Sequence, residues 1–316
     1  MAYTEQTNVA AAQDVIDRIV SFAASAGWTV LKNTIVGISR SATIRKDGVS
    51  DYVHIYNTDV ANVRMCLSVG FETDPVRPDV LVDPSEECLT TLGVGPYPKM
   101  FLFASANTVW VTVAIAANGE YRHLTFGVLE KVGAYSGGTY CDGTAWGTAG
   151  WWASPSSQGN HVPFAVRISG GAPATGSLRV DVPEDDRLNT YFRFGRAFSQ
   201  TGEPTVADTA VGFNQETRES AMVSLADRNA FSGRSILHAV PVFISRAGSS
   251  TYYSPVGVVA DVRFCSINKF APEQEITIAS DVYKVFPWVG KRPINYDNGA
   301  QPAASGDYAF AIRKVP

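Results

Sequence analysis

Residues 99–131 carry the pattern that most strongly constrains the fold of this chain. Apolar residues alternate there with polar or small ones, at the two-residue period of a pleated β-strand. Asn107 and residues 117–119 mark two tight turns, because Asn and Gly tolerate the positive φ of hairpins. The segment therefore predicts three consecutive antiparallel strands. One face of the middle strand consists of Val109, Val111, Val113 and Ile115.

An amphipathic helix is predicted before this meander. Thr7 or Asn8 is its expected N-cap, and Gly27 is its expected stop, with Trp28 folding back on the helix. A second helix is predicted at 216–227. The apolar face of the first helix consists of Val9, Ala12, Ile16, Ile19, Val20 and Ala23.

The rest of the chain favours β-structure. Asp47-Gly48 predicts a hairpin between strands at 42–46 and 50–56, and 63–71 alternates as a half-buried strand. Residues 74–98 are expected to form a long loop with a helical turn near 85–90. Further strands are expected at 165–168, 177–182, 191–196, 240–245, 256–264, 275–278, 282–286 and 308–314. The predicted fold class is mainly β (β-rich α+β), with sandwich-like antiparallel meander sheets and the N-terminal helix packed on a sheet.

Glycine, proline and serine collect at 170–176, which makes this segment the best place for a domain boundary. Residues 1–170 would then hold the helix, the meander and a long Gly/Trp loop at 133–163. Residues 171–316 would form a C-terminal β-rich domain. One continuous fold is the alternative.

Charge and hydropathy exclude several classes of partner. The net charge is −4 and the pI about 5.6, and no cluster of Lys and Arg provides the basic surface that binds nucleic acid. No apolar run approaches the roughly 20 residues of a membrane span, and the polar N-terminus lacks the pattern of a signal peptide. We therefore expect a protein made in a cytosol, with no nucleic-acid or membrane partner. Disulfides between its four cysteines are not expected there.

Catalytic and metal-binding patterns are weak. His54, His123, His161 and His238 are far apart, so no two stand at the spacing of metal ligands on one element. Cys141 with His161 is a poor nucleophile and base, since the surrounding Gly-Thr loop offers nothing that lowers a thiol pKa. The acids at 184–186 are neighbours in a polar turn, and a hydrolase would rest on them and His161 alone. We expect no enzyme activity, no metal and no cofactor.

The Gly- and aromatic-rich segment 133–163 is the best candidate for a functional surface. Loops of this length are usually functional, and Trp and Tyr dominate the binding energy of protein interfaces. Two alternatives stay open: the indoles fold back on the sheet as core, or Trp146, Trp151 and Trp152 form a platform that stacks on sugars. The interface candidates are Tyr135, Tyr140, Trp146, Trp151, Trp152 and His161.

Several strings along the chain resemble a family of virion structural proteins of tailed bacteriophages. The strongest are at 121–131, 282–287 and 306–314, together with Gly137-Gly138. The resemblance implies a non-enzymatic subunit that assembles as a symmetric ring at the neck (collar) or in the tail. Its partners would be other copies of itself and neighbouring virion proteins: portal or connector, tail tube or sheath, or baseplate. It also implies a location in the virion after assembly in the host cytoplasm. A baseplate component or a receptor- or carbohydrate-binding tail module is the alternative.

Overall fold

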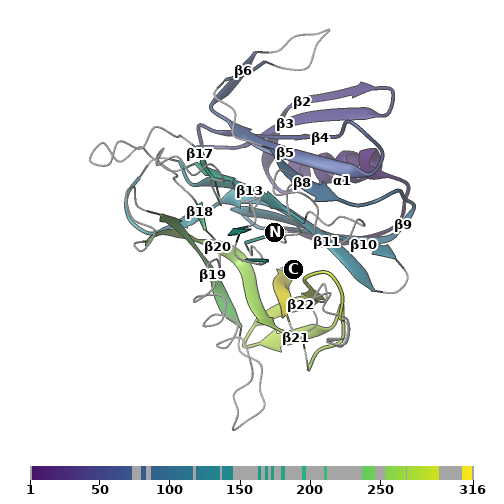
Figure 1. Ribbon diagram of the computed structural model, residues 1–316, viewed down its shortest axis with the longest axis vertical. Helices are drawn as coiled ribbons and strands as arrows, with labels where there is room; N and C mark the ends of the chain where they lie inside the picture. The colour runs from purple at the N-terminus through teal and green to yellow at the C-terminus, as the bar shows by residue number, and fades with distance from the viewer. Residues whose placement is uncertain are drawn as a thin grey trace.

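The computed structural model describes most of the N-terminal half of the chain and ten shorter segments of the C-terminal half. The described residues are mainly β, with antiparallel sheets and the helix α1 (Ala12–Ser25), so the predicted fold class is confirmed (Figure 1). None of their helices has the length and apolar character of a membrane span. The described ranges are 2–72, 80–82, 87–116, 119–135, 137–144, 163–164, 168–169, 172–173, 179–181, 194–196, 210–211, 237–245, 253–267, 269–291 and 308–314.

A seven-stranded sheet lies at the centre of the molecule, in the order β1-β9-β10-β11-β13-β16-β17. Strands β9 (Tyr97–Ala104), β10 (Thr108–Ala116) and β11 (Glu120–Val128) form the predicted meander, and Val109 pairs with both Ala104 and Phe126. Both faces of these strands are buried. The sheet continues through β13 (Thr139–Gly143), β16 (Arg179–Asp181) and β17 (Phe194–Arg196).

The first edge of this sheet corrects the predicted start of the helix. Ala2–Val9 forms strand β1 along β9, whereas Thr7 or Asn8 was the expected N-cap. Asn8 has a φ of 57° near the end of this strand, and the N-cap position of the helix is Ala11, which has no side-chain cap. The Asp14 carboxylate instead accepts a hydrogen bond of 2.9 Å from the Ala10 N–H.

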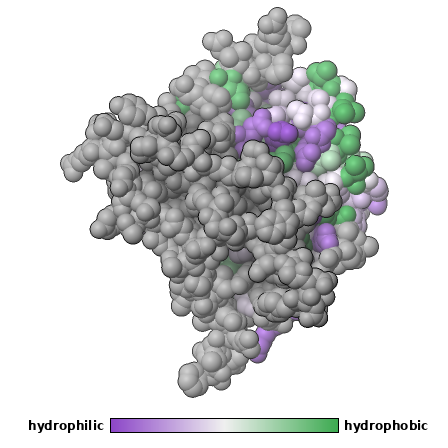
Figure 2. Space-filling view, in the orientation of Figure 1, coloured by the Kyte–Doolittle hydropathy of each residue, from purple (hydrophilic) through white to green (hydrophobic). Residues whose placement is uncertain are grey.

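A five-stranded sheet, β2-β3-β4-β5-β8, forms a second layer. Its hairpin between β3 (Ser39–Lys46) and β4 (Tyr52–Tyr56) is the predicted one, and Gly48 there has a φ of 82°. The edge strand β2 (Trp28–Val36) and its turn expose the apolar Leu31, Ile35, Val36 and Ile38. Figure 2 shows exposed apolar side chains on the side where Figure 1 draws this hairpin.

Two predictions in this layer are wrong. β5 (Asn62–Ser68) is buried on both faces at its end, where Ser68 bonds to His54 and where Phe71, in the following β6 (Gly70–Glu72), packs on Tyr52 and His54. The helical turn expected near 85–90 is replaced by strand β8 (Cys88–Thr91), which buries Cys88 and Thr90 and pairs with β5. β6 pairs with β7 (Val80–Val82).

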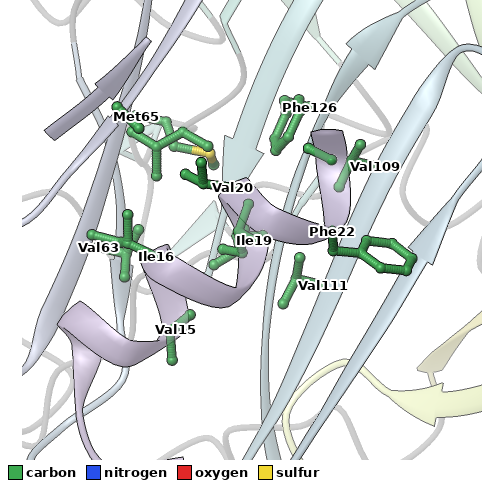
Figure 3. Close-up of a cluster of buried hydrophobic side chains, with 14 of the residues drawn as sticks. Val15, Ile16, Ile19, Val20, Phe22, Val63, Met65, Val109, Val111 and Phe126 are labelled. Atoms are coloured by element: carbon green, nitrogen blue, oxygen red, sulfur yellow. The ribbon is translucent and has the colours of Figure 1, made fainter. Parts of the chain in front are cut away.

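Helix α1 fills the space between these two layers (Figure 3). Ile16 and Val20 lie near Val63 and Met65 of the five-stranded sheet, and the helix also faces Val109, Val111 and Phe126 of the central sheet. Burying each such side chain contributes about 1.5–3 kcal/mol. Gly27 follows the helix with a φ of 84°, as predicted, and Trp28 is buried against Phe126 at 5.2 Å.

The C-terminal strands cover the other face of the central sheet. Their sheet has the order β18-β19-β20-β23-β22-β21. The ring of Trp110 in the central sheet lies 4.8 Å from that of Phe310, and the ring of Phe101 lies 4.9 Å from that of Phe286, measured between ring centroids. β16 and β17, which follow residue 170, pair within the central sheet, and the division at 170 stays a prediction. The helix predicted at 216–227 lies outside the described residues. The remaining strands are β12 (Glu130–Lys131), β14 (Ile168–Ser169), β15 (Ala172–Pro173), β18 (Ala210–Val211), β19 (His238–Ser245), β20 (Tyr253–Ser266), β21 (Glu275–Ile278), β22 (Asp281–Pro287) and β23 (Tyr308–Lys314).

Candidate functional site

The structure describes the residues on both sides of the tryptophan-rich segment 145–162. We call these flanking residues, 142–144 and 163–164, the stem. Thr144 closes the first end. Its N–H donates to the His123 carbonyl oxygen at 2.8 Å, and its carbonyl oxygen accepts from the Thr91 N–H at 2.9 Å. Its hydroxyl oxygen accepts from the His123 N–H at 2.9 Å. The chain therefore leaves the sheet from a position fixed by two neighbouring strands.

Asp142 joins the two ends of the stem. Its buried carboxylate accepts one hydrogen bond from the Gly143 N–H at 2.8 Å and another from the Phe164 N–H at 2.7 Å. Phe164 has a φ of 60°, a costly conformation for a bulky residue that persists only when its surroundings hold it. Its ring is buried beside Trp110 and Tyr140. Residues 142 and 164 are thus held together by contacts that do not involve the segment between them.

The two tyrosines among the interface candidates occupy different environments. Tyr140 is fully buried, donates its hydroxyl hydrogen to Thr108 Oγ1 at 3.2 Å and packs against Phe164. Burial raises its pKa. The structure therefore places Tyr140 beneath the stem rather than at the surface. Tyr135 is half-buried, and its hydroxyl donates to the Val256 carbonyl oxygen at 2.8 Å, which ties the start of the loop to β20.

The other four interface candidates, Trp146, Trp151, Trp152 and His161, lie outside the described residues. So do the acids at 184–186. The proposed role of these side chains therefore rests on the sequence, and the structure contributes the geometry of the stem from which they extend.

The buried histidines serve the packing of the strands. His54 contacts Thr43 Oγ1 at 2.9 Å and Ser68 Oγ at 2.6 Å through its two ring nitrogens. His123 lies in β11, between the central sheet and β22. Among the described residues no group of three His, Cys, Asp or Glu side chains is arranged to hold a metal ion.

A chain of hydrogen bonds fixes the protonation of His123. Its Nε2 lies 3.0 Å from the Pro287 carbonyl oxygen, which can only accept, so Nε2 carries the hydrogen. Nδ1 then accepts from the Thr112 hydroxyl at 3.0 Å, and Thr112 in turn accepts from Trp110 Nε1 at 3.1 Å. Burial lowers the pKa of His123 to about 4. The ring is neutral at physiological pH and links the central sheet to the C-terminal one.

Two features near the stem have no signal in the sequence. The thiols of Cys88 and Cys141 lie 3.7 Å apart, although the residues are 53 positions apart along the chain. The Asp142 carboxylate likewise meets the Phe164 N–H across the whole loop. Such contacts depend on how two sheets pack, and neither residue spacing nor periodicity encodes that.

No protein-family model matches this chain, and a search of curated proteins also returns no match.

Proposed function

We propose that this chain is a non-enzymatic structural subunit of a tailed-phage virion, which assembles as a symmetric ring at the neck (collar) or in the tail. The observation that carries the proposal is the stem: Asp142 and Thr144 hold both ends of a Trp- and Gly-rich segment on a sheet that is buried on both faces. A rigid support lowers the entropic cost of presenting a contact segment to a neighbour. Trp residues are enriched among the contacts that dominate such interfaces.

A second apolar surface agrees with assembly into a ring. Ile35, Val36 and Ile38, at the tip of the β2–β3 hairpin, are 59%, 69% and 52% exposed. They belong to the five-stranded sheet, whereas the stem belongs to the central sheet. A ring of identical subunits needs two different surfaces on each subunit, because every contact is head-to-tail. Clustered exposed apolar side chains often mark such a contact.

The mass of the purified protein in solution, measured by light scattering after size exclusion, tests this proposal. We expect a closed oligomer, and negative-stain images should show rings. The triple variant Trp146→Ala/Trp151→Ala/Trp152→Ala and the double variant Ile35→Ser/Val36→Ser should each shift the population to monomers. Val94→Ser is the matched control, since Val94 is 78% exposed and belongs to neither of the two sets of residues. A wild-type protein that is monomeric and absent from virions would contradict the proposal.

A glycan- or receptor-binding tail module is the second candidate, and the three tryptophans motivate it. Flat indole rings suit the faces of sugar rings as well as they suit protein surfaces. Under this alternative, the triple tryptophan variant still forms the wild-type oligomer but loses binding to a glycan array or to host cells. Loss of the oligomer itself would assign the tryptophans to the subunit interface.

A further inference from the structure

Cys88 and Cys141 form a buried pair of thiols between two sheets. Cys88 is the first residue of β8 in the five-stranded sheet, and Cys141 lies in β13 of the central sheet. Both side chains are fully buried, and their sulfur atoms are 3.7 Å apart. That distance is a contact between thiols, whereas a disulfide bond measures about 2.05 Å.

The backbones around the pair also approach closely. Gly143 lies so near β8 that a Cβ atom on it would be 2.1 Å from Thr90 Oγ1 and 3.2 Å from the Leu89 carbonyl oxygen. One residue further, the Thr91 N–H donates to the Thr144 carbonyl oxygen at 2.9 Å. The two thiols therefore lie beside a tight, hydrogen-bonded contact between the two strands, which holds the sulfur atoms close to each other.

We propose that Cys88 and Cys141 are a dithiol that reacts with peroxide-class oxidants and forms a disulfide. One thiol loses its proton, and hydrogen peroxide oxidises the resulting thiolate to a sulfenic acid. The hydroxide that the peroxide releases combines with that proton, so one water forms in this step. The other thiol then attacks the sulfenic sulfur, the S–S bond forms and a second water leaves. Two thiols and one peroxide thus give one disulfide and two waters. This inference is independent of the proposed virion role.

Access to the pair comes through β8. This strand has only four residues and lies at the edge of its sheet, so the proposal requires that β8 opens locally, breaking the hydrogen bond from Thr91 to Thr144, to expose Cys88. The bond would fasten the edge of the five-stranded sheet to β13, directly before the stem. In the oxidised protein a covalent bond would join β13, which leads into the stem, to β8, and in the reduced protein only packing and hydrogen bonds hold these two strands together.

Peptide mapping of the full-length folded protein tests the proposal. The folded protein is treated with hydrogen peroxide, the peroxide is removed with catalase, and the remaining thiols are then alkylated in denaturant before digestion without reductant. We expect one cross-linked peptide pair that joins Cys88 to Cys141, with Cys66 and Cys265 alkylated, and reversal by dithiothreitol. The Tm should rise by about 5 °C on oxidation, because the cross-link constrains the unfolded chain.

Cys66→Ala is the matched control, since Cys66 is also buried in the five-stranded sheet. It should keep both the cross-link and the rise in Tm, whereas Cys88→Ala and Cys141→Ala should lose both. Separate alkylation or over-oxidation of Cys88 and Cys141 in the folded wild-type protein would overturn the proposal, and this result needs no variant. A cross-link without a rise in Tm would overturn the inference that the bond fastens the two sheets.

Discussion

The close contact between β13 and β8 depends on the missing side chain of Gly143. A Cβ atom there would meet Thr90 Oγ1 at 2.1 Å. Gly143→Ala should therefore lower the free energy of unfolding by about 2–3 kcal/mol, measured by urea denaturation. Thr90→Ala should recover part of this loss in the double variant. Thr90 Oγ1 is buried without a hydrogen-bond partner among the described residues, so its removal breaks no hydrogen bond.

A double-mutant cycle separates this clash from a general loss of packing. The two substitutions should be non-additive, because the alanine methyl group takes the place of the removed hydroxyl. Strict additivity would show that Gly143 is needed for another reason, and the close approach of the two strands would lose its explanation.

His123 makes the stability of the protein depend on pH. Its pKa is about 4 in the folded chain, against 6.5 as the ordinary value. The unfolded chain therefore binds a proton between these values while the folded chain does not, and stability falls as the pH drops from 6.5 to 4. The loss should reach about 3 kcal/mol at pH 4. Denaturation curves at several pH values measure it.

The variant His123→Gln is the control for this pH dependence. It lowers stability at pH 7, because glutamine cannot reproduce both hydrogen bonds to Thr112 and Pro287. Between pH 6.5 and 4, however, its curve should be flatter than that of the wild type. An unchanged slope in the variant would assign the acid sensitivity to other groups.

At the scale of elements, the segment between β20 and β21 connects the C-terminal sheet to the central sheet through Glu273. Its carboxylate accepts from Lys99 Nζ at 2.7 Å and from the Tyr121 hydroxyl at 2.9 Å. Glu273 has a φ of 66°, and its N–H donates to the Val285 carbonyl oxygen at 2.8 Å. Glu273→Ala should cost about 1–2 kcal/mol, mainly because the Tyr121 hydroxyl loses its acceptor.

Glu275→Ala is the control, because Glu275 is more exposed than Glu273 and its shortest ion pair, to Lys314, measures 2.8 Å. The buried Lys284, which also lies 3.8 Å from Glu275, keeps Glu5 as its second partner. Exposed pairs of this kind contribute about 0–1 kcal/mol. Hydrogen exchange should show faster opening of β9 and β11 in Glu273→Ala than in Glu275→Ala. Equal exchange in the two variants would mean that apolar packing alone holds the sheets together.

The elements that the sequence predicts well are those with an apolar stripe of regular period. The meander at 99–131 and the helix face around Ile16 and Ile19 meet this condition, and both agree with the structure. β1 and β2 do not, since polar or exposed residues occupy much of both strands, and β1 is fixed by its pairing with β9 far along the chain. Among the candidate site residues, Tyr140 illustrates the same limit. It packs against Phe164, which is 24 residues further along the chain and is brought near by the hydrogen bond to Asp142.

At the scale of the whole molecule, the central sheet contributes one face to each of two hydrophobic cores. One face packs on α1 and the five-stranded sheet, and the other packs on the C-terminal strands. His123 and Glu273 add polar links across the second contact. The central sheet and the C-terminal sheet therefore depend on each other to bury their facing apolar side chains.

This arrangement predicts how a fragment of the chain behaves. Residues 1–170 alone would leave the aromatic face of the central sheet without Phe286 and Phe310, and would expose Phe101, Phe103 and Trp110. Each aromatic ring buries about 150–250 Å², so the bare face would form an apolar patch well above that of soluble monomers. We expect the fragment to aggregate or to bind the dye ANS strongly, while the full chain binds little. In the full chain, tryptophan fluorescence and far-UV circular dichroism should report one coincident unfolding transition. A soluble fragment with its own cooperative transition would instead establish residues 1–170 as an independent domain. The contact between the central sheet and the C-terminal strands would then be an interface between two domains that fold independently.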